Sequence, residues 1–270
     1  MNNRVKKKFQ DTVWDYFHEH GRHHLPWRTN PTPYRVLVSE IMLQQTQVDR
    51  VIPFFKNWVK SFPNFKRLAS AKQSDILRLW KGLGYNSRAL RLHRSAKIVS
   101  EKYHGRLPRL RTELESLPGV GPYTAGAIRA FAFNQDEAII ETNIRRIFIY
   151  HFFQNKKLVH DQEILSVVQE TLPIGRSADW YGALMDYGTY LAGIIENPNR
   201  NSKHYTKQKK FEGSDRQIRG KILEYLLEDS FTVKVVIKKL DEPTDRVKKI
   251  LEQLEREGFI KNSRGKIFLQ

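Results

Sequence analysis

The fold of this 270-residue chain follows from one stretch, Leu117-Pro118-Gly119-Val120-Gly121-Pro122-Tyr123-Thr124-Ala125-Gly126. Two glycines bracket one apolar residue between segments with a helical pattern. Glycine lets a backbone approach another molecule closely, and Pro122 suits the first turn of a helix, so Gly119 and Gly121 can direct backbone N–H groups at a phosphate. Such a grip would hold DNA without reading its sequence. A turn rich in Pro and Gly also joins two helices in many proteins, and the turn alone leaves both interpretations open.

The charge of the chain favours a polyanionic partner. Its 47 Lys and Arg residues against 29 Asp and Glu residues give a formal net charge of +18, which suits nucleic acid or an acidic membrane surface. No stretch approaches the roughly 20 apolar residues of a membrane span, and the basic start Met1–Lys8 lacks the apolar run of a signal peptide. We therefore expect a soluble intracellular protein, and charge alone leaves both kinds of partner open.

Cysteine is absent from the sequence. Disulfides, thiolate zinc sites and cysteine-ligated iron-sulfur clusters are therefore excluded. The 9 histidines show no paired spacing apart from the neighbours His23 and His24. We expect chemistry without a metal or other cofactor.

Hydrophobic periodicity divides the chain into two parts. Apolar residues recur at helical intervals to about residue 192, as in Val13, Tyr16 and Phe17, and no convincing strand pattern interrupts them. Between Asn197 and Gly213, Pro, Asn, Lys and Gly replace apolar residues, which is typical of a linker. We expect an all-α core over residues 1–196, a basic linker over 197–214 and a second domain over 215–270.

The C-terminal segment has the pattern of three helices and a hairpin. Helices are predicted over Ile218–Leu227, over Val233–Leu240 and around Val247, Ile250, Leu251 and Leu254. Residues Phe259–Leu269 alternate apolar and polar around Ser263-Arg264-Gly265, which predicts a basic β-hairpin. Three helices and a basic hairpin suggest a winged helix that binds duplex DNA. The alternative is a small helical cap that does not contact DNA.

The stretch at 117–126 resembles the hairpin of the helix-hairpin-helix glycosylases, which include endonuclease III and the MutY-type adenine glycosylases. Segments of the MutY branch occur in the same order elsewhere in the chain: Leu25-Pro26-Trp27-Arg28, Ser39-Glu40-Ile41-Met42-Leu43-Gln44-Gln45-Thr46-Gln47, Gly82-Leu83-Gly84-Tyr85 and Leu184-Met185-Asp186-Tyr187-Gly188. The resemblance covers about residues 8–192. It implies a two-lobed glycosylase core that flips a base out of duplex DNA. The expected partner is then double-stranded DNA with a mismatch or damaged base, and not a membrane, and we expect a cytoplasmic, nucleoid-associated monomer.

Glu40 is the first predicted catalytic residue. Its neighbours Val38, Ile41 and Met42 are apolar, so burial should raise the pKa of the carboxyl group. A carboxylic acid that is partly protonated near neutrality can donate a proton to a departing purine and then orient the attacking water. A Glu on a helix is more often a solvated surface residue, but the resemblance places the catalytic Glu of the family at this position.

Glu141 is the second candidate, and here the sequence departs from the family, which has Asp. The role implied for it is electrostatic stabilisation of the positive charge that develops on the sugar. Because Glu is one methylene longer, either the local backbone retreats or the residue no longer performs that role. Asn143 matches a family Asn near the sugar and water, and Thr142 and Asn143 could also cap the following helix.

Tyr123 occupies the hairpin position at which bifunctional members carry a Lys nucleophile. A phenol cannot form a Schiff base with the sugar. The resemblance therefore implies a monofunctional enzyme that leaves an abasic site. The alternative is a packing residue with a bonded hydroxyl group.

The resemblance also implies a set of DNA contacts. Gln44, Gln45 and Tyr85 resemble family residues that wedge into the duplex or touch the opposite base; without the resemblance they would be surface and packing residues. The further DNA-binding residues that we predict are Arg28, Thr46, Arg88, Leu117, Gly119, Val120, Gly121, Lys207 and Lys209.

Two regions differ from the family. Where most members have four cysteines for an iron-sulfur cluster, the chain has Ala192 and then the basic stretch Arg200–Lys210, which would contact phosphate directly or be a solvated linker. The C-terminal domain with which MutY-type enzymes recognise oxidised guanine is replaced by the winged-helix candidate.

Three functions remain open from the sequence. The leading one is removal of adenine mispaired with oxoguanine or G, which the Gln44-Gln45 pair favours. The second is removal of thymine or uracil from G mispairs, because pocket shape sets base choice. The third is a non-catalytic DNA-binding protein on a decayed glycosylase core, which Glu141 in place of Asp keeps possible.

Overall fold

The structure is a computed structural model that describes residues 1–206 and 211–270. Its contacts divide the chain into two compact units. Unit 1 combines Met1–Gln44 with Arg106–Lys207, and unit 2 combines Gln45–Gly105 with Gln208–Gln270. The predicted contacts Lys207 and Lys209 lie outside the described residues.

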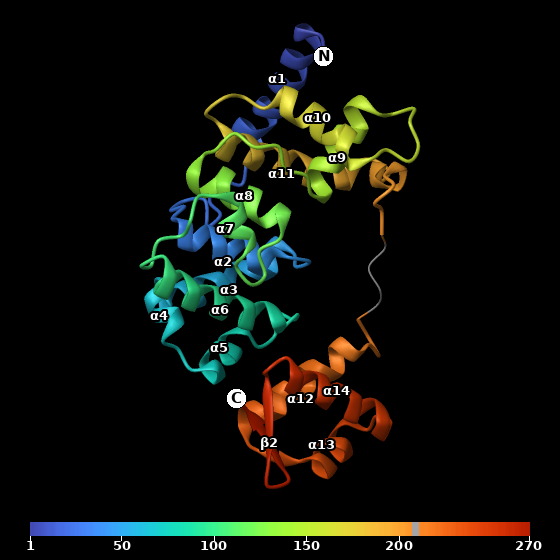
Figure 1. Cartoon of the computed structure of the whole chain (residues 1–270). Coiled ribbons are helices and arrows are strands. Elements are labelled where there is room, and N and C mark those ends of the chain that lie inside the picture. Colours follow the sequence, from blue (N-terminus) through green and yellow to red (C-terminus); the bar gives the residue numbers. More distant parts are fainter. Residues whose placement is uncertain (207–210) are drawn as a thin grey trace. The chain divides into compact units, whose positions relative to one another are not determined.

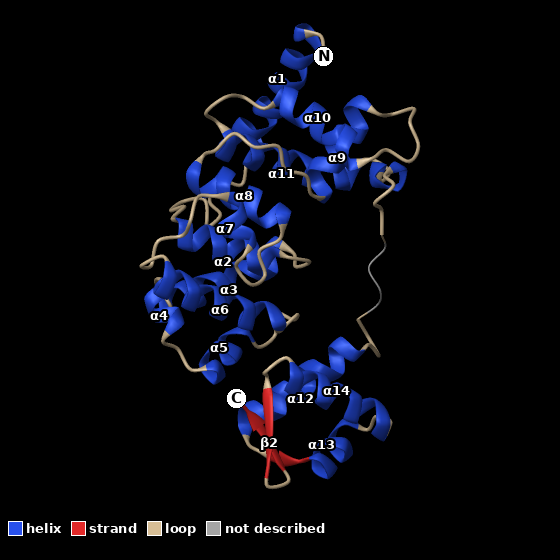
Figure 2. Ribbon diagram, viewed as in Figure 1, coloured by secondary structure: helices blue, strands red, loops and turns tan. Residues whose placement is uncertain are grey.

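Unit 1 is helical throughout its described part (Figures 1 and 2). Its elements are α1 (Asn3–His20), α2 (Pro33–Leu43), α7 (Arg111–Glu115), α8 (Pro122–Phe133), α9 (Thr142–Phe152), α10 (Asp161–Thr171), α11 (Ser177–Ile194) and the 3₁₀ helix η1 (Pro198–Asn201). Helix α2 packs against α8, and α11 packs against α1, α8 and α9.

Aromatic residues form much of the core of unit 1. Phe9 of α1 makes edge-to-face contacts with Phe148, Phe152 and Trp180, at ring-centroid distances of 5.3, 4.9 and 6.0 Å, a geometry that aromatic pairs prefer. Phe9, Val13 and Phe17 are buried along one face of α1, as helical periodicity predicts. This core fixes α1, α9 and α11 together and supports the N-terminus of α9.

Unit 2 contains the remaining helices and all the strands that the structure describes. Its elements are α3 (Val48–Ser61), α4 (Phe65–Ala69), α5 (Gln73–Trp80), α6 (Ser87–Lys102), α12 (Asp215–Glu228), β1 (Phe231–Thr232), α13 (Val233–Leu240), α14 (Thr244–Arg256), β2 (Ile260–Ser263) and β3 (Lys266–Leu269). The strands form an antiparallel sheet in the order β1-β3-β2, in which Ile260 pairs with Leu269 and Ser263 with Lys266.

The predicted elements of the C-terminal segment are confirmed. The helix over Val233–Leu240 is found with both predicted ends, and the hairpin turns at Arg264 and Gly265, whose φ angles are 52° and 76°. Strand β1 was not predicted, because two residues are too short for a pattern of alternation. The assignment as a winged helix stays a prediction.

The C-terminal segment is bonded to helices α5 and α6 within unit 2. The Gln73 amide donates to the carbonyl of Gly258 at 3.0 Å, the Arg94 guanidinium donates to the carbonyl of Glu257 at 2.8 Å, and Lys81 forms an ion pair with Glu224 at 2.7 Å. Contacts in space thus pair 211–270 with 45–105, which linear sequence does not reveal, and the linear division at 196 and 214 stays a prediction.

The expected all-α core is confirmed. Among the residues that the structure describes, no helix is both long and apolar enough to cross a membrane.

Candidate active site

Glu40 lies near the end of α2, where the chain is almost entirely buried. The helix starts at Thr32, whose hydroxyl accepts the N–H of Arg35 at 3.3 Å, and Pro33 stands in its first turn. Glu40 is only 9% exposed. Burial, and then the nearby carboxylate of Glu141, raise the pKa of its carboxyl group to about 7. The group is therefore partly protonated near neutral pH, as the apolar neighbours predicted.

Tyr123 brings the hairpin to Glu40. It is the second residue of α8, and its hydroxyl donates a hydrogen bond to the Glu40 carboxylate, which stabilises the ionised form and lowers the pKa of Glu40. Burial, and then the charge of Glu40, raise the pKa of the phenol well above its usual range. Tyr123 therefore remains a neutral hydrogen-bond donor to Glu40, and its catalytic role stays a prediction.

Glu141 is the N-cap of α9. Its Oε1 accepts the backbone N–H groups of Asn143 at 2.7 Å and Ile144 at 2.9 Å. Burial raises the pKa of Glu141 above its usual value, and these two N–H groups and the charge of Arg146 offset only part of that rise. The extra methylene relative to Asp is absorbed by the side chain folding onto its own helix, where the N-terminal dipole favours a negative charge.

Asn143 is held by Glu141 and by Arg146, and it packs against Gly188 of α11. Its amide Nδ2 donates to Glu141 Oε2 at 3.4 Å, and its Oδ1 accepts from Arg146 at 2.6 Å. Arg146 also donates to the carbonyl of Gly188 at 2.8 Å. A Cβ at Gly188 would lie 2.6 Å from the Cβ of Asn143, so only glycine fits there. Gly188 stands in a quoted motif, but nothing in the sequence revealed that α11 contacts Asn143.

The hairpin between α7 and α8 has the geometry of an anion grip. Gly119 has φ 88°, and Gly121 is the N-cap of α8, where the described residues supply no side-chain cap. The amide of Gln44 donates to the carbonyl of Gly119 at 3.1 Å and to Thr124 Oγ1 at 3.3 Å. Gln44 thus fastens α2 to the hairpin.

Two of the predicted hairpin contacts are core residues. Leu117 is 2% exposed and Val120 is 5% exposed. The backbone N–H of Val120 donates to the carbonyl of Leu117 at 3.0 Å, so it already has an acceptor inside the turn. Their side chains pack in the core beneath the hairpin backbone. Their contact with DNA stays a prediction, which this burial does not favour.

Residues 38–172 match the family described as HhH-GPD superfamily base excision DNA repair protein. The chain belongs to this family. Adenine DNA glycosylase of Buchnera aphidicola subsp. Baizongia pistaciae is 38% identical over 194 residues, which cover 72% of this chain and 55% of that protein. Adenine DNA glycosylase of Mycolicibacterium smegmatis is 33% identical over 233 residues, which cover 80% of this chain and 79% of that protein. The chain spans about half the length of the Buchnera relatives.

Solved structures of the same fold agree with this assignment. A structure of a thermostable thymine-DNA glycosylase superposes with a TM-score of 0.65 at 27% identity, over 73% of this chain and 91% of that one. An endonuclease III–DNA complex superposes with a TM-score of 0.59 at 18% identity, over 70% of this chain and 87% of that one. The latter shows the fold alone.

Arg28 of this HhH-GPD protein is held by protein groups. Its guanidinium forms an ion pair with Asp186 at 2.7 Å and donates to the carbonyl of Gly182 at 3.1 Å. Arg22 binds the same carboxylate, which is 3% exposed. This network ties the loop after α1 to α11, so the geometry favours a structural role for Arg28, and its contact with DNA stays a prediction.

The predicted DNA contacts of unit 2 lie on two neighbouring chain segments that Arg88 connects. Arg88 is 4% exposed and donates to Thr46 Oγ1 at 3.1 Å and to the carbonyl of Gly84 at 3.0 Å, and burial lowers its pKa to about 10. Tyr85 has φ 48° and Gln45 has φ 55°, which is unusual for residues other than glycine. Arg88 therefore bonds to both strained segments, next to the exposed Gln45 in one and next to Tyr85 in the other.

An iron-sulfur cluster with cysteine ligands does not fit this HhH-GPD protein, because no cysteine is present. No group of three or more His, Cys, Asp or Glu with metal-binding geometry occurs within the described ranges 1–206 and 211–270. The segment after α11 is instead fastened by hydrogen bonds. The buried Asn199 donates to the carbonyl of Thr142 at 3.1 Å, and the Val159 N–H donates to the carbonyl of Asn201 at 2.8 Å.

Proposed function

We propose that the chain is a monofunctional DNA glycosylase that hydrolyses the N-glycosidic bond of a flipped adenine mispaired with oxoguanine or G. The observation that carries the proposal is the carboxyl group of Glu40, with a pKa of about 7, bonded to Tyr123 of the hairpin and close to the carboxylate of Glu141. Two carboxyl groups with different environments are what glycosidic hydrolysis requires.

Glu40 supplies the proton transfers in this proposal. In its protonated form it donates a proton to a ring nitrogen of the purine as the N-glycosidic bond breaks, and the bonding electrons leave with the base. Its carboxylate then accepts a proton from the water that attacks the anomeric carbon, which regenerates the acid. A pKa near 7 lets one group perform both transfers at neutral pH.

Glu141 supplies charge in this proposal. Its carboxylate faces the sugar and stabilises the oxocarbenium-like charge as the bond breaks. Its two backbone hydrogen bonds hold it in place, so no reorganisation is needed during the reaction. Tyr123 has no amine to attack the sugar, so the product is an abasic site without strand cleavage.

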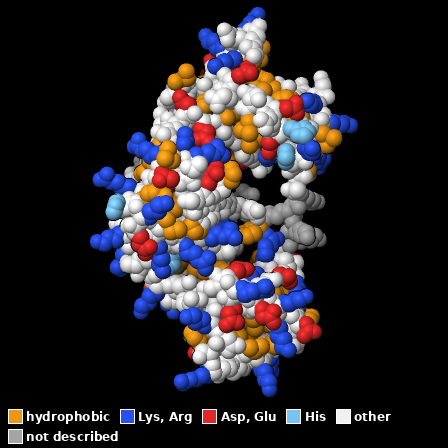
Figure 3. Space-filling view, viewed as in Figure 1, with side chains coloured by type: hydrophobic (Ala, Val, Ile, Leu, Met, Phe, Trp, Pro, Cys, Tyr) orange, Lys and Arg blue, Asp and Glu red, His pale blue; other side chains and the backbone are white. Residues whose placement is uncertain are grey.

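Duplex DNA as the partner is supported by charge and by the hairpin. Lys and Arg are spread over the visible face of the molecule (Figure 3), and the N-terminus of α8 can bind a phosphate. We also propose a winged helix over residues 215–270, a monomeric enzyme, a cytoplasmic and nucleoid-associated location, and catalysis without a metal cofactor.

Adenine is the proposed base because relatives that match 72–84% of this chain are named adenine DNA glycosylases. Thymine or uracil opposite G is the second candidate, which the likeness to a thymine-DNA glycosylase structure supports. Base choice depends on pocket shape, which the carboxylates and the hairpin do not determine.

The test is a single-turnover incubation with duplexes that contain one A:oxoguanine, A:G, T:G or U:G pair. Alkali then cuts any abasic site, and an untreated sample reports strand cleavage by the enzyme itself. We expect cutting only after alkali and only of the adenine duplexes, with none by the Glu40→Gln variant. Cutting at T:G or U:G would assign the second candidate, and no cutting would indicate a non-catalytic DNA-binding protein.

A further inference from the structure

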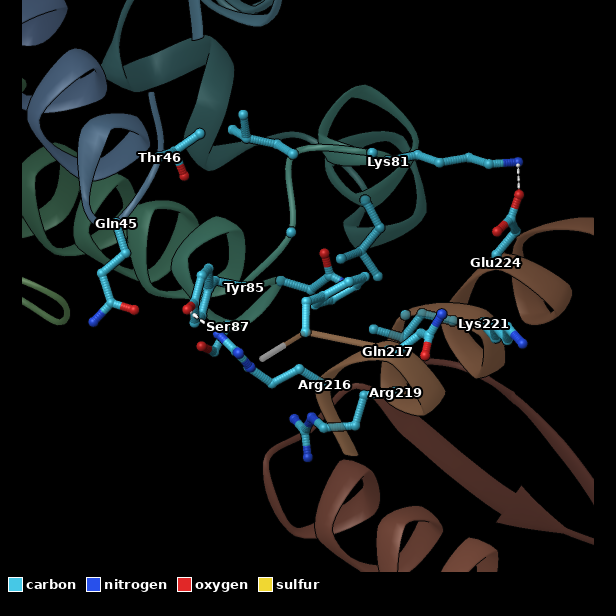
Figure 4. A pocket seen from close by; sticks show the side chains of 18 of the residues that line it. Gln45, Thr46, Lys81, Tyr85, Ser87, Arg216, Gln217, Arg219, Lys221 and Glu224 are labelled. Carbon is cyan, nitrogen blue, oxygen red and sulfur yellow. Dashed lines mark hydrogen bonds and ion pairs between the residues drawn. The ribbon is translucent and has the colours of Figure 1, made fainter. Parts of the chain in front are cut away.

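A cavity of about 920 Å³ lies within unit 2, between the first turns of α12 and the loop that joins α5 to α6 (Figure 4). The segment Gln45–Gln47 closes another side of it. Its volume is in the range of ligand sites. The family match ends at residue 172, so the wall contributed by α12 lies beyond the part of the chain that the family describes.

The lining of the cavity is strongly basic. Six cationic residues face two acidic ones: Arg50, Lys81, Arg91, Arg216, Arg219 and Lys221 against Glu224 and Glu257. The two acids are already paired, Glu224 with Lys81 at 2.7 Å and Glu257 with Arg219 at 2.5 Å. Arg91 and Lys221 are exposed and make no ion pair within the described residues. An anionic ligand would therefore meet available positive charge.

Aromatic side chains stand among these cations. The guanidinium of Arg216 lies 5.1 Å from the centre of the Tyr85 ring and donates to its hydroxyl group, as Figure 4 shows. Phe211 is 58% exposed, and its ring centre is 5.9 Å from the same guanidinium. Tyr85 is half-buried, so Phe211 is the ring available to a ligand. Cations beside an exposed aromatic ring are the combination with which proteins bind the backbone and bases of a nucleic acid strand.

Two amide side chains also line the cavity. Gln45, whose own φ is positive, lines the cavity, and Gln217 of α12 lines it as well. Amide groups both donate and accept, which suits the edges of bases. A phosphate-bearing chain with bases matches cations, rings and amides together, whereas a simple anion would use only the cations.

We propose that this cavity binds a segment of a DNA strand, with phosphates on Arg91 and Lys221 and a base against the exposed ring of Phe211. Helix α12 then gives the C-terminal segment a direct part in substrate binding. The inference rests on the proposed function, because that function makes DNA the ligand.

The first experiment measures DNA affinity by fluorescence anisotropy at several salt concentrations. The full-length protein is titrated with a duplex that carries an uncleavable abasic analogue, so that no base release is required. We expect the Arg91→Ala/Lys221→Ala variant to bind about tenfold more weakly, with a salt slope smaller by about 0.9 for each phosphate that the variant no longer neutralises. Thermal melting confirms that the variants are folded.

The matched control removes the same number of charges from unit 2, away from the cavity and from the C-terminal segment. Lys60 on α3 and Lys66 on α4 are exposed and do not line the cavity. The Lys60→Ala/Lys66→Ala variant should bind almost as the wild type does. Equal losses of affinity for the two variants would mean that only overall charge matters, and the proposal would be overturned.

A second experiment uses the absence of cysteine from the sequence. The Lys221→Cys variant carries a single thiol, which can form a disulfide with a thiol tethered to the backbone of one DNA strand. We expect cross-linking of the Lys221→Cys variant and none of the Lys60→Cys variant. The absence of a cross-link for tethers on either strand would overturn the proposal.

These experiments separate the inference from the proposed function. If the wild type releases no base from any duplex but the cavity variant alone loses affinity, the cavity binds DNA and the glycosylase assignment fails. If the wild type releases adenine and both variants bind alike, the glycosylase assignment stands and the cavity proposal fails.

Discussion

At the scale of single residues, the environment of Glu40 was readable from sequence and that of Glu141 was not. The apolar neighbours of Glu40 on one helix predict burial and a raised pKa, which the structure has. The position of the Glu141 carboxylate depends on how its own side chain folds back on α9, and sequence left two outcomes open. The contact of Gly188 with Asn143 joins distant elements, so no local pattern could reveal it.

The pH dependence of base release should report Glu40. If the protonated form is the acid, the single-turnover rate constant falls about tenfold per pH unit once the pH exceeds a value near 7. The Tyr123→Phe variant loses the hydrogen bond that lowers this pKa, so its profile should move to higher pH. Rate constants measured from pH 5 to 9 check this. An unchanged profile in the Tyr123→Phe variant would contradict the role of the phenol.

Burial of Glu40 should also make stability depend on pH. The folded pKa of about 7 lies above the usual value of 4.5, so the folded state binds more protons, and the wild type loses stability as pH rises from about 4.5 to about 7. Glu40→Gln lacks this loss and should gain up to about 3 kcal/mol over the wild type across that window. Urea unfolding at pH 5 and 8 measures the difference. The exposed Glu101→Gln variant is the control and should show no such gain.

At the scale of elements, α9 depends on its first residues and on what packs against them. Glu141 satisfies two N–H groups of its first turn, and η1 packs against it through Asn199. The sequence predicted that this region departs from the family. It could not predict that η1 is bonded to α9, because the hydrogen bond of Asn199 joins a side chain to a backbone carbonyl 57 positions away.

Substitution of Glu141 should separate its two tasks. Glu141→Asp keeps a carboxylate that can cap α9 and should retain most stability and activity. Glu141→Ala should lower the free energy of unfolding by about 1 kcal/mol through loss of the cap, and it should abolish measurable base release. Chemical denaturation and single-turnover assays give the two values. Full activity of Glu141→Ala would remove the electrostatic role.

Asn199 should contribute to stability through one buried hydrogen bond. Asn199→Ala leaves the carbonyl of Thr142 without this donor and should cost about 1–3 kcal/mol. Asn201 is the matched control, because it takes part through its backbone carbonyl, which Asn201→Ala retains. Thermal melting of both variants compares them. Equal melting temperatures would show that the Asn199 side chain does not fasten η1.

At the scale of the whole molecule, charge and periodicity predicted the helical core and the partner class, whereas the composition of the two units could not be predicted. Unit 2 joins residues 45–105 with the C-terminal segment through pairs such as Gln73 with Gly258 and Lys81 with Glu224. These pairs connect polar surface residues, and polar surface residues carry no pattern that identifies a partner far along the chain.

The net charge of +18 should make DNA binding strongly dependent on salt. If the complex makes about six or more phosphate contacts, affinity should fall by about a thousandfold or more between about 50 and 200 mM salt. Anisotropy titrations with an undamaged duplex measure the slope. Affinity that does not change with salt would show that the positive charge serves another purpose.

The capping of α9 by Glu141 also bears on how this protein can change over evolutionary time. Active-site carboxylates are commonly held at a cost to stability, so their loss often yields a more stable but inactive protein. Glu40 follows that rule, since its burial opposes ionisation. Burial opposes ionisation at Glu141 as well, but there the same carboxylate also caps a helix. Drift toward a stable, inactive form is therefore easier at Glu40 than at Glu141, where a loss of activity would also remove the cap of α9.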